Sequence, residues 1–226
     1  MGQQPVDLET LRRLKRFSQL KNGDLEVVSR ASKIVDVEKG SVLFLEGSGA
    51  DGLMVVVRGY VKISKNLDSP RGLRVFGPGH SLGEPALVSN RIYPGSAVAL
   101  TSSTILSLPL SVYEQLSLAS PVFAENVTQA VAAGSRFMAD AMVNFVEGDA
   151  EERVVRFIKS LLLEFGICED QQTLKLPFYL SRQEVASFVN LRTETVSRIM
   201  SRWEADEKLV STSSGFVAKA NDWLQS

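Results

Sequence analysis

The stretch from Leu180 to Trp203 constrains the fold of this chain more than any other, because it predicts two short helices joined by a tight turn. Ser181 can cap the first helix, and Glu184 three residues later completes a capping box. Asn190 tolerates the left-handed backbone that a sharp turn requires. The apolar residues of the second segment recur at the spacing of one helical face: Val196, Ile199, Met200 and Trp203.

The opposite face of the second predicted helix is polar. It carries Glu194, Ser197, Arg198 and Arg202, and Thr193 is the residue expected to cap the helix. An apolar back packed on its own domain, with a polar front free for the major groove, is the arrangement of a helix-turn-helix that reads DNA. The alternative is an ordinary pair of amphipathic helices, because periodicity alone does not specify DNA binding.

The net charge of the chain does not indicate a nucleic-acid partner. The 226 residues include 25 Lys/Arg and 26 Asp/Glu, and the part from residue 151 onward has ten Lys/Arg and eleven Asp/Glu. Affinity for DNA would therefore depend on local basic residues and on a dimer that doubles the contacts. The local basic residues are Arg182, Arg192, Arg198, Arg202 and Lys208.

Composition narrows the class of protein further. The single cysteine, Cys168, excludes an intramolecular disulfide and a cysteine-based metal cluster within one chain. No apolar run approaches the ~20 residues of a membrane span, so we expect a cytoplasmic protein without a membrane partner. Neither a glycine-rich phosphate loop nor a metal-ligand or Ser/His/Asp set is visible, so we do not expect an enzyme.

The N-terminal half is predicted to begin with helices and to continue with short β-strands. Residues 7–32 predict helix, broken at 22–24, where Asp24 can cap a second helical segment. Short β-rich runs separated by glycine-containing turns then favour a small antiparallel barrel or a double-sheet roll. These runs are residues 34–37, 42–45, 53–57, 60–64, 73–76, 95–100 and 104–108.

A long helix is predicted from about residue 120 to 145, with Pro121 in its first turn. Apolar residues at spacings of four and three form a heptad seam, which we expect to join two copies of the chain. The seam is Val127, Val131, Gly134, Met138, Ala141 and Phe145. A second apolar row, Phe123, Ala130 and Phe137, is expected to face the barrel; the alternative is that the seam itself packs there.

The remaining segments complete an α+β organisation. Residues 146–149 predict a hinge, Asp149 can cap a helix over 150–165, and Gly166 ends it. Residues 209–218 predict a β-hairpin, which beside a helix-turn-helix forms a wing. We therefore expect a sensor domain over 1–119, a dimerisation helix over 120–146, and a winged helix-turn-helix over 147–226.

This order of elements resembles, over nearly the whole chain, the bacterial transcription regulators related to the cyclic-AMP receptor protein and the fumarate–nitrate reduction regulator. The strongest local match is Ser181-Arg182-Gln183-Glu184 followed by Glu194-Thr195-Val196-Ser197-Arg198. The resemblance implies a cyclic-nucleotide-binding-like β-roll (a double-stranded jelly-roll barrel) and a homodimer on a palindromic operator in double-stranded DNA. It also implies RNA polymerase as a partner if the protein is an activator.

The recognition code departs from that of the cyclic-AMP receptor class. Members of that class carry arginine immediately before the recognition-helix glutamate, where this chain has Thr193. Glu-x-x-Ser-Arg is similar to the fumarate–nitrate class, which reads half-sites like TTGA. Arg198 can donate two hydrogen bonds to guanine, Glu194 can accept from cytosine, and Ser197 can approach a thymine. The alternative for Arg198 is an exposed salt bridge with Glu194. The predicted DNA-binding set is Ser181, Arg182, Arg192, Thr193, Glu194, Thr195, Ser197, Arg198 and Arg202.

The segment from Gly83 to Ser96 is similar to the phosphate-binding cassette of the family. Glu84 stands where the family binds the ribose hydroxyl and Ser96 where it binds the phosphate, but Gly95 replaces the phosphate-binding arginine. Arg91 could substitute only if the loop is rebuilt. On the long helix, Met138 and Ala139 replace the Thr and Ser that meet the purine. The expected effector pocket is Gly83, Glu84, Pro85, Arg91, Ser96 and Met138, and cyclic AMP is not its expected ligand.

Other effectors of the family can be assessed by the side chains that each needs for binding. An iron–sulfur cluster needs several cysteines, and the chain has one. Haem needs an axial ligand, and the only histidine, His80, lies in a predicted turn where solvation is the simpler expectation. Cys168 is expected to be an inert thiol rather than a redox centre. The alternatives are a non-nucleotide ligand, a gas sensed through haem, and a constitutively active regulator with a vestigial pocket. A protein-interaction module with a vestigial helix-turn-helix is a separate class.

Overall fold

The computed structural model describes residues 5–67, 71–170, 173–220 and 223 of the chain, with residues 140–146 described by their backbone alone. The chain forms two compact units. The N-terminal unit comprises residues 1–67 and 74–137, and the C-terminal unit comprises residues 68–73 and 138–226. None of the helices over the described residues has the length and apolar character to span a bilayer.

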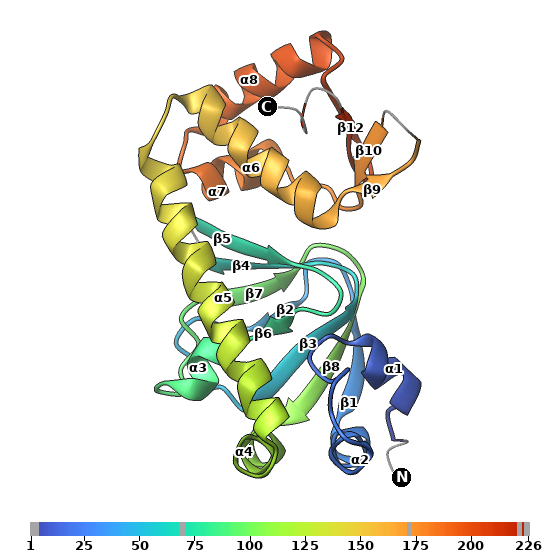
Figure 1. Ribbon diagram of the computed structural model, residues 1–226. Helices are drawn as coiled ribbons and strands as arrows, with labels where there is room; N and C mark the ends of the chain where they lie inside the picture. The colour runs from blue at the N-terminus through green and yellow to red at the C-terminus, as the bar shows by residue number, and fades with distance from the viewer. Residues whose placement is uncertain (1–4, 68–70, 171–172, 221–222, 224–226) are drawn as a thin grey trace. The chain divides into compact units, whose positions relative to one another are not determined.

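Two four-stranded sheets build the N-terminal unit as a β-roll (Figure 1). One sheet has the order β1-β8-β3-β6, with β1 Lys33–Val37, β8 Ser103–Pro109, β3 Gly52–Arg58 and β6 Ser81–Leu82. The other has the order β2-β7-β4-β5, with β2 Val42–Phe44, β7 Ser96–Ala99, β4 Val61–Lys65 and β5 Arg71–Phe76. The predicted strands and the double-sheet roll are confirmed. The sequence did not predict β6 or the short helix that follows it, α3 Glu84–Val88.

The core of the β-roll lies between the two sheets, where β-branched and aromatic side chains are buried. Val55 and Val56 on β3 and Leu106 on β8 are fully buried. Phe44 stacks on Tyr93 with ring centroids 3.7 Å apart, and burial raises the pKa of Tyr93 to about 12, with a further contribution from Asp51. A methylene at Gly83, which has φ +83°, would lie 2.6 Å from the Tyr93 ring, so glycine is required there.

The N-terminal helices differ from the expectation at one boundary. α1 Leu8–Arg13 is capped by Asp7, and α2 begins at Asn22 and ends at Ala31. Asp24 therefore lies inside the first turn of α2 and does not cap it. Its carboxylate instead accepts a 2.6 Å hydrogen bond from the Ser120 hydroxyl. This bond fixes α2 to the junction between α4 Leu110–Ala119 and the long helix α5 Pro121–Val146.

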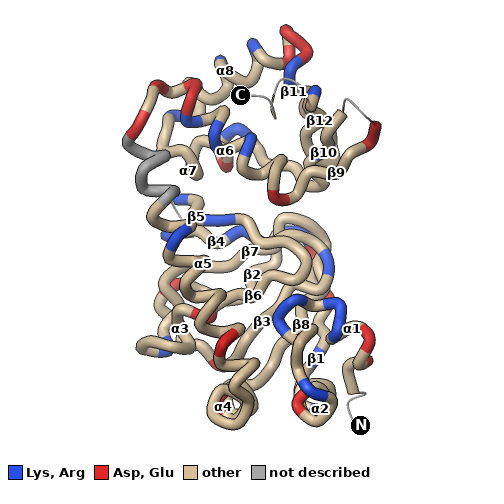
Figure 2. The backbone as a smooth tube through the Cα atoms, in the orientation of Figure 1, with Lys and Arg blue, Asp and Glu red and all other residues tan. Residues whose placement is uncertain are grey.

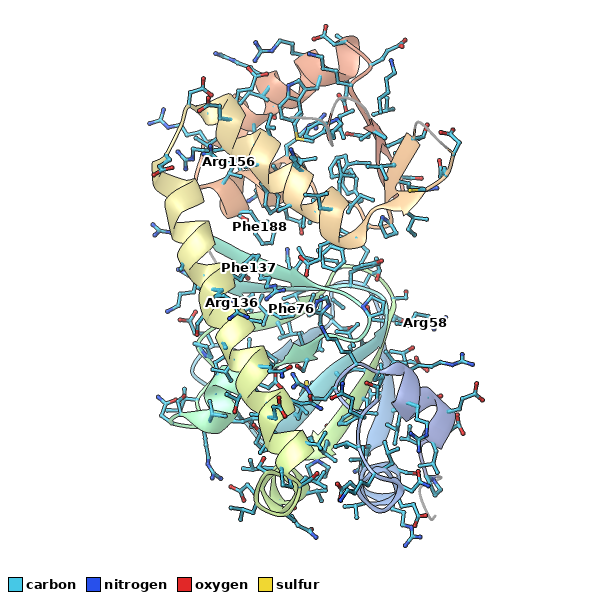
Figure 3. The ribbon with its side chains drawn as sticks, viewed as in Figure 1. Arg58, Phe76, Arg136, Phe137, Arg156 and Phe188 are labelled. Atoms are coloured by element: carbon cyan, nitrogen blue, oxygen red, sulfur yellow. The ribbon has the colours of Figure 1, made fainter. Side chains whose placement is uncertain are left out.

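The first turns of α5 belong to the core of the N-terminal unit. Phe123 is fully buried and meets Tyr113 edge-on at 5.6 Å. Val127 is only 7% exposed in the same cluster, so the prediction that it belongs to an intermolecular seam is wrong. Phe137, in the row expected to face the barrel, lies near Phe76 (Figure 3). The guanidinium of Arg74 lies over the rings of both Phe137 and Phe76. The rings are 4.4 and 5.0 Å from that guanidinium, a distance at which a cation attracts an aromatic face.

Helix α6 of the C-terminal unit is capped at its start. Asp149 and Glu152 form a capping box at the start of α6 Ala150–Phe165, as predicted for Asp149. Gly166 ends the helix with an ordinary negative φ, whereas Gly148 supplies the positive φ before it. Helices α7 Arg182–Val189 and α8 Thr193–Ala205 follow, beside a sheet of order β11-β12-β10-β9. Its strands are β11 Leu209–Thr212, β12 Gly215–Lys219, β10 Thr173–Leu176 and β9 Ile167–Cys168. The predicted hairpin is confirmed as β11–β12; β9 and β10 were not predicted.

Two leucines of α4 provide a matched test of this packing. Leu116 is 2% exposed and Leu118 is 90% exposed. Leu116→Ala should lower the free energy of unfolding of the N-terminal unit by about 2–5 kcal/mol, because a buried leucine leaves a cavity. Leu118→Ala should change it by less than about 0.5 kcal/mol. Urea unfolding of both variants measures the difference, and equal effects would contradict the packing of α4.

Candidate DNA-binding and effector sites

The first helix of the helix-turn-helix begins as predicted. The Ser181 hydroxyl accepts a 3.1 Å hydrogen bond from the backbone N–H of Glu184, and the Glu184 carboxylate accepts one of 2.8 Å from the Ser181 N–H. This reciprocal capping box satisfies two amide donors that would otherwise lack partners. Val185, Ala186 and Val189 of α7 are buried in the C-terminal unit.

The turn between α7 and α8 is held by a residue that sequence reasoning missed. Asn190 adopts the predicted left-handed backbone, with φ 51° and ψ 51°. Arg153 on α6 donates to the backbone carbonyl of Val189 and, at 3.2 Å, to that of Asn190. These carbonyls lie at the C-terminus of α7, where a positive charge is favoured. Only the fold brings Arg153 to a turn 36 residues further along the chain, so no local sequence signal identified it.

Helix α8 is anchored by its apolar face. The predicted residues of that face, Val196, Ile199, Met200 and Trp203, are all buried. The Trp203 indole N–H donates a 2.9 Å hydrogen bond to Glu151, and its ring meets Trp223 edge-on at 5.3 Å. The N-cap position is Arg192, which makes no side-chain cap, so the predicted capping by Thr193 is wrong.

The polar face of α8 presents an acid and a base that are not bonded to each other. Glu194 and Arg198 are exposed, and over the residues that the structure describes no ion pair joins them. The alternative interpretation of Arg198 as the salt-bridge partner of Glu194 is therefore not what the structure shows. Thr193, Thr195 and Ser197 are half-buried on the same helix.

Two of the basic residues predicted to contact DNA are engaged within the chain. Arg182 pairs with Glu204 at 2.8 Å, and Arg202 pairs with Glu151 at 2.9 Å. Burial alone would raise the pKa of Glu204, but hydrogen bonding from Ser211 and the Arg182 guanidinium together hold that pKa below its usual range. Figure 2 shows basic and acidic residues interspersed over the C-terminal unit. Arg192 and Arg198 remain exposed on α8 and its N-cap.

The expected effector pocket in the β-roll contains a buried ion pair. Glu84 opens α3 after the left-handed Gly83 and is buried. Its carboxylate lies 2.5 Å from the guanidinium of Arg16, in the turn segment that follows α1. The Ser81 hydroxyl donates a 2.6 Å hydrogen bond to the same carboxylate. Sequence reasoning missed Arg16, because its partner is 68 residues away.

Ser96 and Arg91, two other expected pocket residues, make polar contacts with groups other than Glu84. The Ser96 hydroxyl accepts a 2.9 Å hydrogen bond from the Glu46 amide. Arg91 has φ 58° and its guanidinium pairs with Glu114 on α4, with both side chains about half exposed, so its suggested role as a phosphate ligand stays a prediction. Pro85 is exposed, and Met138, in the C-terminal unit, is 41% exposed.

The two side chains considered for haem or redox chemistry lie in different surroundings. His80 is half-buried, with Nδ1 3.1 Å from the carbonyl oxygen of Gly77 and its ring edge-on to Phe76, so it is not the solvated turn histidine expected. Cys168 is exposed and free. Within the described ranges, no three His, Cys, Asp or Glu side chains gather as a metal site would require.

Asn190 allows a direct test of the turn geometry. Glycine adopts φ near +51° without penalty, whereas valine meets a steric clash there of about 1–2 kcal/mol. Asn190→Gly should therefore leave the melting temperature of the C-terminal unit nearly unchanged, and Asn190→Val should lower it by several degrees. Differential scanning calorimetry separates the two; a valine variant as stable as the glycine variant would argue against the left-handed turn.

Comparisons with known proteins agree with this architecture. The family described as cyclic nucleotide-binding domain matches residues 34–119, and the Crp-like helix-turn-helix domain matches residues 152–218. A CRP-like cAMP-activated global transcriptional regulator of Mycobacterium tuberculosis is 22% identical over 222 residues, covering 94% of this chain and 99% of its own. The transcriptional activator protein Anr of Pseudomonas protegens is 26% identical over 192 residues, covering 82% of this chain and 75% of its own.

A solved structure supports the same fold. FixK2 from Bradyrhizobium japonicum aligns with a TM-score of 0.72 at 21% identity, covering 83% of this chain and 92% of that one. The two matched families together span the β-roll and the winged helix-turn-helix, and the two relatives described above are both named as transcription regulators. The chain therefore belongs to the CRP/FNR family of DNA-binding transcription regulators.

Proposed function

We propose that the protein is a homodimeric regulator that binds a palindromic operator with TTGA-type half-sites and does not use cyclic AMP as its effector. The observation that carries this proposal is the polar face of α8, on which Glu194 and Arg198 are exposed and unpaired with each other. Both side chains are therefore available to base edges when α8 enters the major groove.

The chemistry of these side chains selects the bases. Arg198 donates two hydrogen bonds to O6 and N7 of guanine, and Glu194 accepts one from N4 of cytosine. Ser197, one residue before Arg198, approaches the methyl group of thymine. Each well-formed pairing discriminates against the wrong base by about 1–3 kcal/mol.

The intramolecular ion pairs favour a dimer as the DNA-binding species. With Arg182 and Arg202 paired to carboxylates, the recognition region offers few free cations to the phosphates. Because affinity depends on the number of phosphates neutralised, two half-sites are needed to reach specific binding.

The exposed apolar residues of α5 supply the surface for this dimer. Val131 and Gly134 are half-buried and Met138 is exposed, and a methylene at Gly134 would have no neighbour within 4 Å. A second α5 can therefore approach closely at Gly134. Ala141 and Phe145, predicted to continue the seam, have side chains that lie outside the described part of the chain.

The polar groups of the β-roll argue against cyclic AMP as the effector. A cyclic phosphate needs a cation, but Gly95 stands in place of the arginine and Arg91 pairs with Glu114. The carboxylate expected to bind the ribose forms an ion pair with Arg16 instead. The Mycobacterium tuberculosis relative is named as cAMP-activated, whereas this chain has glycine in place of the arginine expected to bind the cyclic phosphate.

Selection of binding sites from random DNA tests the code. TTGA half-sites in inverted repeat are expected. Arg198→Ala should weaken binding to the selected operator at least tenfold and reduce discrimination at the guanine, because a bidentate contact is lost. Arg202→Ala serves as the matched control: its guanidinium is already paired with Glu151, so operator affinity should change by less than threefold. Recovery of a TGTGA half-site, or unchanged discrimination by Arg198→Ala, would refute the code.

The dimer can be tested independently of DNA. Gly134→Arg fits the open space of a single chain but obstructs close approach of a second helix, so sedimentation should show a monomer. Gln129→Arg, an exposed position on the same helix away from the seam, should leave the dimer intact. A Gly134→Arg variant that still sediments as a dimer would place the interface elsewhere.

A further inference from the structure

The Arg16–Glu84 pair is unusual because both charges are buried. The Arg16 side chain is 8% exposed and that of Glu84 is 5% exposed. Taking two charges out of water is costly, and a buried pair is retained at that cost only when other bonds complete it. Exposed pairs of the N-terminal unit, such as Arg91–Glu114, carry no such cost.

The hydrogen bonds around the pair join three separate elements, although Arg16 Nε and Glu84 Oε1 have no hydrogen-bond partner among the described residues. The Arg16 guanidinium donates to the Ser81 hydroxyl at 2.5 Å, and Ser81 in turn donates to Glu84. The same guanidinium donates to the backbone carbonyl of Asn126 on α5. The Asn126 side-chain amide returns a 3.1 Å hydrogen bond to the backbone carbonyl of Arg16. Arg16 therefore ties the N-terminal segment, the cassette at β6–α3 and the first half of α5 to one another.

We propose that Arg16 is an intramolecular ligand of the β-roll, which occupies the effector-binding carboxylate of Glu84 and fixes α5 through Asn126, so that DNA binding needs no nucleotide. This inference rests on the proposed function, since α5 is the helix through which the two copies pair. A bound nucleotide would link the cassette at β6–α3 to α5. In this chain, Arg16 of the N-terminal segment makes that link.

Competition for Glu84 favours the arginine over a ribose. A ribose hydroxyl is a neutral group, whereas the Arg16 guanidinium places an opposite charge 2.5 Å from the carboxylate, and attraction between charges is stronger away from water. Burial raises the pKa of Glu84 by more than Arg16 and Ser81 lower it. The Arg16 guanidinium therefore opposes the effect of burial, and removal of the arginine takes the opposite charge away from the buried carboxylate.

Variants of the full-length protein test this role. Arg16→Lys keeps the charge but cannot bridge Ser81 and Asn126 with a planar fork. The double variant Arg16→Met/Glu84→Gln removes both charges together, so it avoids the unpaired buried charge that can prevent a single variant from folding. Arg91→Met, which breaks the exposed pair with Glu114, is the matched control.

Two readouts are needed, and each has a definite expectation. Without nucleotide, the wild type and Arg91→Met should bind the selected operator with affinities within twofold of each other. Arg16→Lys and the folded double variant should bind at least tenfold more weakly. Hydrogen exchange should show faster exchange of the α5 amides around Asn126 in Arg16→Lys and in the double variant alone. Addition of millimolar cyclic AMP to the wild type should change neither its affinity for the operator nor the exchange rates of its α5 amides.

The outcomes separate this inference from the function on which it rests. A wild type that binds its operator only with a cyclic nucleotide would overturn the inference, as would a double variant with wild-type affinity and wild-type exchange in α5. If the wild type binds no selected DNA under any condition while the exchange difference appears, the proposed function fails and the tie from Arg16 to α5 stands.

Discussion

The division of α8 into a buried face and an exposed face is the constraint on which DNA recognition by this protein depends. Four large apolar side chains fix the rotation of the helix about its axis, and the Trp203 hydrogen bond to Glu151 fixes its position against α6. Arg153 holds the preceding turn through two backbone carbonyls. Because these anchors lie behind the helix, the residues on its front are free to vary, and operator preference can change without loss of the fold.

Local sequence signals accounted for the parts of the fold that local chemistry decides. The capping boxes at Ser181 and Asp149, the left-handed Asn190 and the glycine-separated strands are each set within a few residues, so they were predictable. Val127 was assigned wrongly because a heptad pattern does not tell a seam between copies from a core contact within one chain. Strands β6 and β9 have two residues each, too few to show a pattern, whereas the alternation of polar and apolar residues in β10 was overlooked.

The contacts around the two candidate sites were hidden from sequence reasoning for a different reason. Arg16, Arg153 and Glu204 meet partners that are 22 to 68 positions away, and a charged residue shows no preference in sequence for a particular distant partner. The expected roles of Arg182 and Arg202 were drawn from their place in the motif, whereas the structure gives each a carboxylate. The base contacts of α8 and the ligand of the β-roll stay predictions.

The carboxylates that neutralise Arg182 and Arg202 also affect how the protein finds its site. Non-specific attraction to DNA grows with the number of free cations, and a genome offers a large excess of non-specific sites. A regulator with few free cations is held less by that excess, so a larger share of its molecules is available to operators. With few free basic side chains, a small number of protein molecules per cell is then enough to occupy the operators.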